Sequence, residues 1–308
     1  MKLFDLHCDI GSDCEYQIMR GFKEPFKNRH LKKLIDGGVS YVCCACFFFG
    51  KESWDDMAKM IIDMNLELAN NDLIHVKEKE DFLKDHLVHG IISVEGMCGV
   101  KDNVREKIRF MKDHHVKVAS LTWNEENALA TGVKGNPLRG LTDLGYEVLD
   151  EMAKCDIALD VSHLNEASFY DVIKNHKGKV CATHSNARSL CAHDRNLTDQ
   201  QIKAIAAKDG IIGMNACRFF VSEKEEEQNV LTLAKHARYI ADLVGVKHVA
   251  CGFDFMDFFG EQGRSEMAKD IESDDVAQNF VNALYEVGFN DEEVEQICFK
   301  NAVEFFTR

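Results

Sequence analysis

The segment Phe4-Asp5-Leu6-His7-Cys8-Asp9 is a short apolar run with a polar ending, and it guides the interpretation of the whole chain. Side chains two residues apart on a strand point to the same face. His7 and Asp9 would therefore converge where a strand over residues 3–9 ends. An imidazole and a carboxylate at a rigid strand end make half of a site for a divalent metal ion. The pattern is weak alone, but similar endings recur on later strands.

Short apolar runs with a β-branched and aromatic bias alternate along the chain with longer stretches of helical periodicity. We expect strands over residues 3–9, 39–49, 90–95, 117–123, 158–163, 180–185, 210–216 and 249–255. Between and after them we expect helices over residues 55–70, 104–114, 143–154, 166–175, 198–208, 231–243, 276–286 and 291–306. Thr142 and Asn165 directly precede two of these helices and are expected to cap them.

Eight strands alternating with helices, without a repeat or a linker-like change of composition, predict an α/β fold. The specific prediction is one (β/α)8 TIM-type barrel, amidohydrolase-like, forming a single domain over residues 1–308. An open doubly wound sheet is the alternative. Against it, no Gly-x-Gly-x-x-Gly follows the first strand and no P-loop pattern occurs. The polar strand endings also fall where barrel enzymes build their sites.

The composition limits the partners of the chain. An apolar content of 45% with 29% charged residues is typical of a soluble globular protein. A formal charge of −15 argues against binding to nucleic acid or to an anionic membrane surface. No stretch has the apolar length needed to span a bilayer, and the start moves straight into a strand without signal-peptide anatomy. We therefore expect a cytoplasmic protein.

The chain has twelve cysteines, and their pattern is not that of a disulfide framework. Many of them lie inside apolar runs, where a free cysteine behaves as a small hydrophobic residue. Cys43-x-x-Cys46 matches a redox or zinc spacing, but neighbours on a strand alternate faces and no second pair follows at zinc-finger distance. Core packing is therefore the expected role of this pair.

Five of the expected strands end in residues that bind metals, namely His7 with Asp9, Glu95, His163, His184 and Asp254. This set exceeds the four ligands of a structural zinc site. It suits two divalent ions that share a carboxylate and a bridging water or hydroxide. Glu125 and Glu126 compete with Glu95 for the shared position, and Glu95 is preferred because it directly ends an apolar strand.

Seven motifs occur in order along the chain. They are His7-x-Asp9, Val94-Glu95-Gly96, Leu121-Thr122-Trp123-Asn124, Asp160-Val161-Ser162-His163, Thr183-His184-Ser185-Asn186-Ala187-Arg188, Arg195-Asn196 and Gly252-Phe253-Asp254-Phe255. As an ordered set they resemble the membrane (renal) dipeptidase family of binuclear zinc peptidases, a branch of the amidohydrolase-like barrels. The resemblance covers nearly the whole chain and is closest to the soluble, bacterial-type branch.

The resemblance implies a role for each matching residue. His7 and Asp9 would bind one zinc, His163 and His184 the other, and Glu95 would bridge both. Asp254 matches the position of the catalytic acid and base. Arg195 matches the position that holds the carboxylate of the substrate's C-terminal residue, with Asn196 beside it. The animal enzymes carry a substrate-contacting His where this chain has Trp123, which either contacts substrate or packs the barrel mouth.

The expected function is therefore that of a cytoplasmic zinc-dependent dipeptidase with two Zn²⁺ per chain, although Mn and Co also suit these ligands. The expected partner is a small dipeptide, and the resemblance implies a homodimer. Two alternatives stay open. One is a metal-dependent amidohydrolase that acts on another small amide or an N-acyl amino acid. The other is a metal-bound barrel that binds a ligand without turnover.

Overall fold

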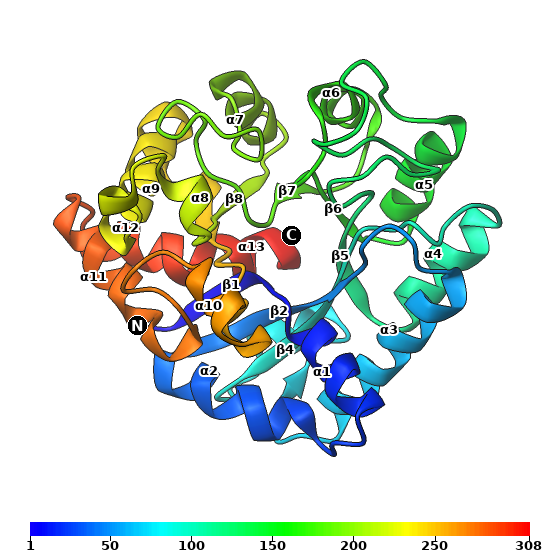
Figure 1. Cartoon of the computed structure of the whole chain (residues 1–308), viewed down its shortest axis with the longest axis horizontal. Coiled ribbons are helices and arrows are strands. Elements are labelled where there is room, and N and C mark those ends of the chain that lie inside the picture. The colour runs from blue at the N-terminus through cyan, green and yellow to red at the C-terminus, as the bar shows by residue number, and fades with distance from the viewer.

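A computed structural model describes all 308 residues, and eight parallel strands form a closed ring at its centre (Figure 1). In ring order they are β1 (Leu3–Cys8), β2 (Val39–Phe47), β4 (His89–Glu95), β5 (Val116–Ser120), β6 (Ala158–Asp160), β7 (Val180–Ala182), β8 (Ile211–Met214) and β9 (Val249–Cys251). Pairing of Asp5 with Cys251 closes the ring between β1 and β9. A ninth strand, β3 (Ile74–His75), pairs with β4 outside the ring.

Helices surround the ring, as expected for a (β/α)8 barrel. Seven of them correspond to predicted helices: α3 (Trp54–Ala69), α4 (Val104–Asp113), α5 (Asp143–Lys154), α6 (Glu166–Asn175), α7 (Asp199–Ala206), α9 (Val230–Val244) and α11 (Gln278–Glu286). Seven of the predicted helices and all eight predicted strands are confirmed, with shifts of a few residues at their ends. Thr142 and Asn165 cap α5 and α6 by accepting hydrogen bonds from the N–H groups of Gly145 and Ser168.

Two segments differ from the prediction. Residues 10–37, assigned to no element, form α1 (Ile10–Met19), the π-helical turn η1 (Phe26–Leu31) and α2 (Lys32–Gly37). The last predicted helix, 291–306, is interrupted: α12 (Asp291–Glu295) leads through the π-helical η7 (Gln296–Lys300) into α13 (Asn301–Thr307). Its apolar pattern continues through the interruption, so periodicity alone did not reveal it.

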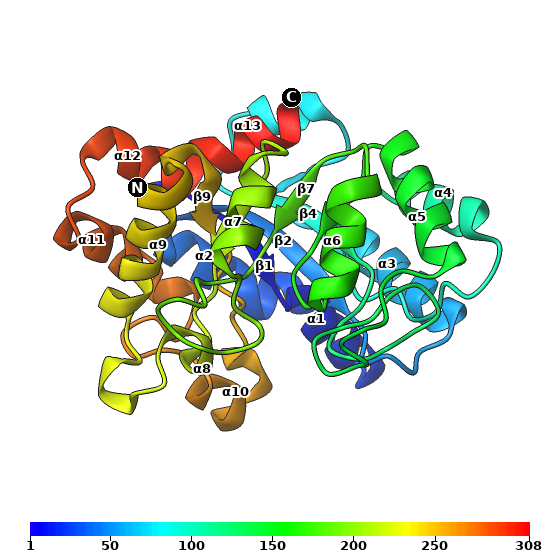
Figure 2. The same cartoon turned by 90° about the horizontal axis from the view of Figure 1, so that it is seen from above.

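Short helical turns complete the structure: η2 (Lys79–Leu83), α8 (Arg218–Val221), η3 (Glu225–Glu227), η4 (Val246–His248), η5 (Asp257–Phe259), α10 (Glu261–Ser265) and η6 (Asp274–Val276). Figure 2 shows that α1, α8 and α10 lie at one end of the barrel, while both termini and α13 lie at the other. The loops that leave the carboxyl ends of the strands are on the side of α1, α8 and α10.

The core consists of two apolar clusters. The smaller takes one or two residues from each of the eight ring strands, so it fills the inside of the barrel, and Phe305 and Phe306 of α13 belong to it. The larger cluster lies between the strands and the outer helices. All twelve cysteines are free and buried, and the core packing expected for Cys43 and Cys46 is confirmed. None of the helices is long and apolar enough to cross a membrane.

Candidate metal centre

The residues predicted as metal ligands meet at the carboxyl end of the barrel. His7 is the penultimate residue of β1 and Asp9 directly follows this strand, Glu95 is the last residue of β4, and His163 and His184 follow β6 and β7. All five are buried, with at most 7% of each residue exposed to solvent. Burial of so many ionisable groups is unfavourable unless they interact with one another or with a cation.

Glu95 lies at the centre of this cluster. Its Oε2 is 3.3 Å from Nε2 of His7, and its Oε1 is 2.7 Å and 3.5 Å from the Nε2 atoms of His163 and His184. Asp9 Oδ1 lies 3.6 Å from Nε2 of His7. The potential ligands form two groups, one of His7, Asp9 and Glu95 and the other of Glu95, His163 and His184, which share Glu95.

Asp254, which follows β9, faces the same point. Its Oδ1 is 3.7 Å from Nε2 of His7, and its Oδ2 accepts a hydrogen bond of 3.1 Å from the side-chain amide of Asn215. Asp254 and His163 have positive φ angles of 62° and 73°. Residues other than glycine rarely adopt this left-handed conformation, which costs about 1–3 kcal/mol and is found mainly at functional sites.

Hydrogen bonds on the outer side of two rings fix which nitrogen faces the centre. Nδ1 of His163 donates to Oδ1 of Asn124 over 3.0 Å. Nδ1 of His184 donates over 2.7 Å to the hydroxyl of Thr183, which in turn donates over 2.5 Å to Asp160. With Nδ1 protonated on both neutral rings, the lone pairs of both Nε2 atoms point into the cluster.

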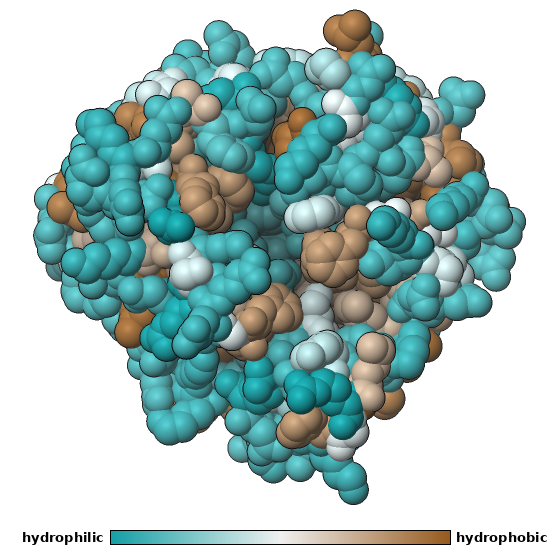
Figure 3. Space-filling model, viewed as in Figure 1, coloured by the Kyte–Doolittle hydropathy of each residue, from teal (hydrophilic) through white to brown (hydrophobic).

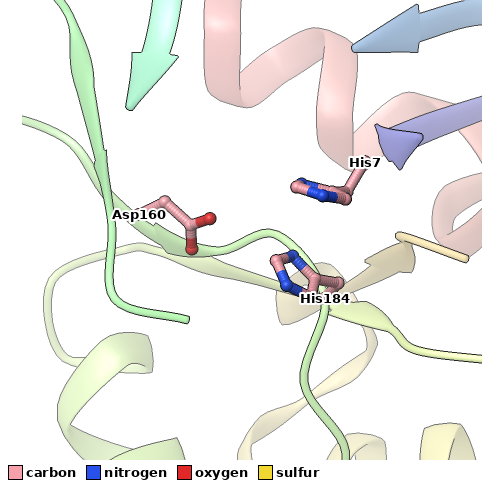
Figure 4. Close-up of side chains that lie close together, drawn as sticks. All are labelled: His7, Asp160 and His184. Atoms are coloured by element: carbon pink, nitrogen blue, oxygen red, sulfur yellow. The ribbon is translucent and has the colours of Figure 1, made fainter. Parts of the chain in front are cut away.

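Asp160 helps to orient the ring of His184 through the hydroxyl of Thr183. Figure 4 shows it beside His184, with the ring of His7 approaching from another strand. These three side chains are close enough to form a further potential ligand group. However, the carboxylate of Asp160 already accepts hydrogen bonds from the backbone N–H groups of Ser162 and Thr183, each 2.9 Å long, in addition to the Thr183 hydroxyl.

The electrostatics match ligands of a cation. Burial lowers the pKa of His163 to about 4 and that of His184 well below its usual value, so both rings are neutral at pH 7. Burial also acts to raise the pKa of Glu95, but the neighbouring imidazoles of His7 and His163 hold it well below its usual value. Neutral imidazoles beside an ionised carboxylate are the protonation states in which these side chains bind divalent metals.

The donor atoms also fit a bound metal because several of them lack any other partner. Nε2 of His7 and Oδ1 of Asp9 are buried and make no hydrogen bond. The Nε2 atoms of His163 and His184 are 2.9 Å apart, and neither carries a proton when Nδ1 is the donor. Two facing lone pairs at this distance repel each other unless a cation binds both.

The family model described as membrane dipeptidase (peptidase family M19) matches residues 1–308, the whole chain. The chain belongs to the membrane dipeptidase family. The resemblance inferred from the ordered motifs is thereby confirmed.

Two curated proteins are similar to this chain in sequence. A protein from the pqqA 5′ region of Klebsiella pneumoniae is 31% identical over 181 residues, which cover 56% of this chain and 66% of that protein. An uncharacterized dipeptidase of Schizosaccharomyces pombe is 29% identical over 195 residues, or 60% of this chain and 47% of the relative. The chain spans about half to two thirds of the length of these curated relatives.

A metallopeptidase from Rhodobacter sphaeroides, crystallised with a phosphinate mimic of the dipeptide L-Ala-D-Ala, has the same fold. It superposes with a TM-score of 0.85 at 21% identity, covering 100% of this chain and 99% of the other. An amidohydrolase from Pseudomonas aeruginosa superposes with a TM-score of 0.80 at 22% identity, covering 91% of each chain. The (β/α)8 barrel predicted from the sequence is therefore confirmed as the fold of this chain.

A cavity of about 990 Å³ opens above the cluster. Arg195 and Trp123 line it, together with Asp9, Glu95 and Asp254 of the cluster. Arg195 is buried. One terminal nitrogen donates to the carbonyl oxygen of His184 over 3.3 Å, and its Nε has no partner. Burial lowers the pKa of the Arg195 guanidinium. A guanidinium with an unused donor in a cavity is well suited to bind a carboxylate.

Trp123 packs its ring at right angles to those of Phe47 and Phe49, with centroid distances of 5.1 Å and 5.9 Å. It thus forms part of the cavity wall. Asn196 does not line the cavity, and its amide donates to the carbonyl oxygens of Cys191 and Phe220. A direct contact of Asn196 with substrate stays a prediction.

The two competitors of Glu95 lie apart from the ligand groups. Glu125 is held by the amide of Asn127, and Glu126 pairs with Arg139 at 3.5 Å. The sequence interpretation missed the role of Asn215 beside Asp254. A signal was present, because Asn215 is a polar residue that directly follows the apolar strand β8, and the other site residues also lie at or just beyond the ends of their strands.

Proposed function

We propose that the chain is a metal-dependent dipeptidase that hydrolyses the amide bond of small dipeptides at a binuclear centre. Family membership supports the reaction class, and the sharing of Glu95 between two ligand groups supports the number of metal ions. We expect zinc, because imidazole and carboxylate ligands suit it, although Mn and Co would also bind. A single domain over residues 1–308 would carry this site. A cytoplasmic location and a homodimer stay predictions from the sequence.

In this proposal His7 and Asp9 hold one metal ion, His163 and His184 hold the other, and Glu95 binds both. When bound, the two cations supply a water of lowered pKa and polarise the carbonyl group of the scissile amide. The chain itself keeps the imidazoles of His163 and His184 neutral and oriented. For His184 this is the task of Thr183 and Asp160.

Asp254 moves the proton in this scheme. Its Oδ2 is held by Asn215, and its Oδ1 faces the cluster. Burial, reinforced by the charges of Asp9 and Glu95, raises the pKa of Asp254 well above its usual value. A carboxylate with a raised pKa accepts a proton from water more readily, and its Oδ1 then delivers that proton to the nitrogen of the departing amine.

Arg195 positions the substrate by pairing with its C-terminal carboxylate, which favours dipeptides over longer chains. Trp123 forms the wall of the cavity beside the scissile bond. An N-acyl amino acid has the same carboxylate but lacks the free amine, so it is the most informative alternative substrate.

The observation that carries this proposal is the placement of Glu95 between the two ligand groups. Its test is the metal content of purified, reconstituted protein by mass spectrometry, combined with ninhydrin detection of amino acids released from L-L and L-D dipeptides. We expect near two metal ions per chain and cleavage that a chelator abolishes. Two metals with cleavage of N-acyl amino acids only would favour the amidohydrolase. Two metals without any turnover would favour the ligand-binding barrel, and no metal would contradict the proposal.

A further inference from the structure

The cavity above the metal centre is larger than a dipeptide of small residues needs. Its volume of about 990 Å³ lies at the upper end of the range, about 300–1,000 Å³, in which proteins hold drug-sized ligands. The centre and Arg195 occupy the floor and one wall. The remaining space is enclosed by side chains that the proposed reaction does not use.

Part of the unused lining is an apolar surface beside charged residues such as Glu15 and Glu52. Phe47 and Phe49 at the end of β2 contribute to it, together with Tyr16 and Met19 of α1 and Phe22 just beyond this helix. We call these five residues the aromatic wall. Four of them are strongly exposed: Met19 is 68% exposed, Phe49 65%, Phe22 54% and Tyr16 51%. Figure 3 shows apolar residues gathered around the hollow at the centre of this face.

The aromatic wall lies opposite Arg195. In the ring of eight strands, β2 is four strands away from β7, which is halfway round, and Arg195 follows β7. The metal ligands lie between them. If Arg195 holds the C-terminal carboxylate and the scissile amide lies over the ligands, the N-terminal residue of the substrate points toward β2 and α1.

The wall is held in shape without a ligand. The carboxylate of Glu52 accepts hydrogen bonds of 3.0–3.1 Å from the backbone N–H groups of Phe49, Gly50 and Lys51. The Phe49 ring packs edge-on against Phe47 with a centroid distance of 4.6 Å. Arg20 stacks over the rings of Tyr16 and Phe22, 5.2 Å and 5.4 Å from their centroids. A preformed apolar surface binds an apolar group with little loss of conformational entropy.

We propose that the aromatic wall binds the side chain of the substrate's N-terminal residue and selects dipeptides in which this residue is large and apolar. This specificity rests on the proposed dipeptidase function. Exposed aromatic rings at the edge of an otherwise buried site lose contact with water when such a side chain covers them, and that transfer is favourable. A glycine or alanine at the N-terminal position leaves them exposed.

The test compares kcat/KM for Phe-Ala and Gly-Ala, which present the same C-terminal residue to Arg195. We expect Phe-Ala to be favoured by about tenfold or more, in line with the discrimination that hydrophobic pockets achieve. Phe49→Ala and Tyr16→Ala should each lower this ratio by a factor of about 3–10. Their effect on the ratio between Ala-Phe and Ala-Gly, where only the C-terminal residue varies, should be small.

Tyr170→Ala is the matched control. Tyr170 is an exposed aromatic residue on α6 and does not line the cavity, so both ratios should stay at the wild-type values. Metal content and the circular dichroism spectrum check that each variant is folded. Two outcomes would overturn the proposed selectivity of the aromatic wall and leave the proposed dipeptidase function in place. One is a wild-type ratio of kcat/KM near one; the other is an equal loss of kcat/KM for Phe-Ala and Gly-Ala in Phe49→Ala. No hydrolysis of any dipeptide by metal-loaded protein would overturn the proposed function, and the specificity with it.

Discussion

The two ends of the barrel interior are built by the same strands but have opposite chemistry. On β4, Ile91 and Glu95 both point inward, four residues apart, because side chains of a strand alternate. Ile91 belongs to the apolar cluster that fills the amino-terminal end of the barrel, here called the lower half, whereas Glu95 lies among three imidazoles at the mouth, the carboxyl end, here called the upper half. The lower half makes contacts that stabilise the fold. The upper half collects buried polar groups that need a cation, and these are unfavourable for stability without one.

From this contrast we expect a substitution of Glu95 to have the largest effect on metal binding and hydrolysis. Glu95→Gln removes the negative charge shared by both ligand groups, so we expect loss of bound metal and of dipeptide hydrolysis below detection. Metal content by mass spectrometry and chelator-sensitive hydrolysis measure the two effects. Glu125→Gln is the control, because Glu125 is a half-buried carboxylate near the mouth that lies outside the ligand groups. Metal loss in Glu125→Gln but not in Glu95→Gln would place the bridging position at Glu125.

The next effect separates metal binding from proton transfer within the upper half. Asp254→Asn keeps the shape of the side chain but cannot accept a proton. We expect kcat to fall by a factor of about 10²–10⁴, the usual contribution of general acid–base catalysis. Metal content should stay near two per chain, since Asp254 belongs to neither of the two ligand groups that share Glu95. Hydrolysis at the wild-type rate would disprove the role of Asp254.

A substitution in the lower half should have the opposite effect: it should lower the stability of the fold and leave metal binding and hydrolysis unchanged. Ile91→Ala leaves a cavity in the fully buried cluster and should lower the free energy of unfolding by about 2–5 kcal/mol. Urea unfolding of the metal-free protein measures this loss. The folded fraction should still bind two metals and hydrolyse dipeptides, because Ile91 does not touch the centre. A variant of normal stability with reduced metal content would mean that the two halves are not separable.

The sequence was sufficient to predict the parts of the molecule that depend on local patterns. Each strand is a short apolar run, and each ligand directly follows or ends such a run, as Glu95 and His184 illustrate. The order of the strands then brings these ends together in any closed barrel. For this reason the fold and the set of converging side chains could be expected before the structure was known.

The parts that were missed depend on contacts between distant segments. The buried face of α1 includes Asp13 and Gln17, and Asp13 is paired with Arg29 and His30, so this helix carries no apolar stripe. Asn124 and Asn215 orient His163 and Asp254 over sequence separations of 39 residues each. No spacing rule predicts such a pair, because only the folded barrel places the two side chains together.

The smallest effect concerns the hydrogen bonds behind the centre. Thr183→Val preserves shape but removes the hydroxyl that links Asp160 to Nδ1 of His184. Without this acceptor, His184 can place its proton on Nε2, where it blocks the metal. We expect metal affinity to fall by a factor of about 10–100, as for other residues that support metal ligands. At saturating metal, most of the activity should return.

Thr122→Val is the control for this substitution. Thr122 is equally buried and also near the mouth, but its hydroxyl has no hydrogen-bond partner. Replacing an unsatisfied buried hydroxyl by a methyl group is neutral or stabilising, so metal affinity should not change. Titration of metal-free protein with Zn²⁺ in a competing chelator compares the two variants directly. Equal affinities in Thr183→Val and Thr122→Val would show that the ring of His184 is oriented by packing alone, and the polar upper half would then need no support beyond its ligands.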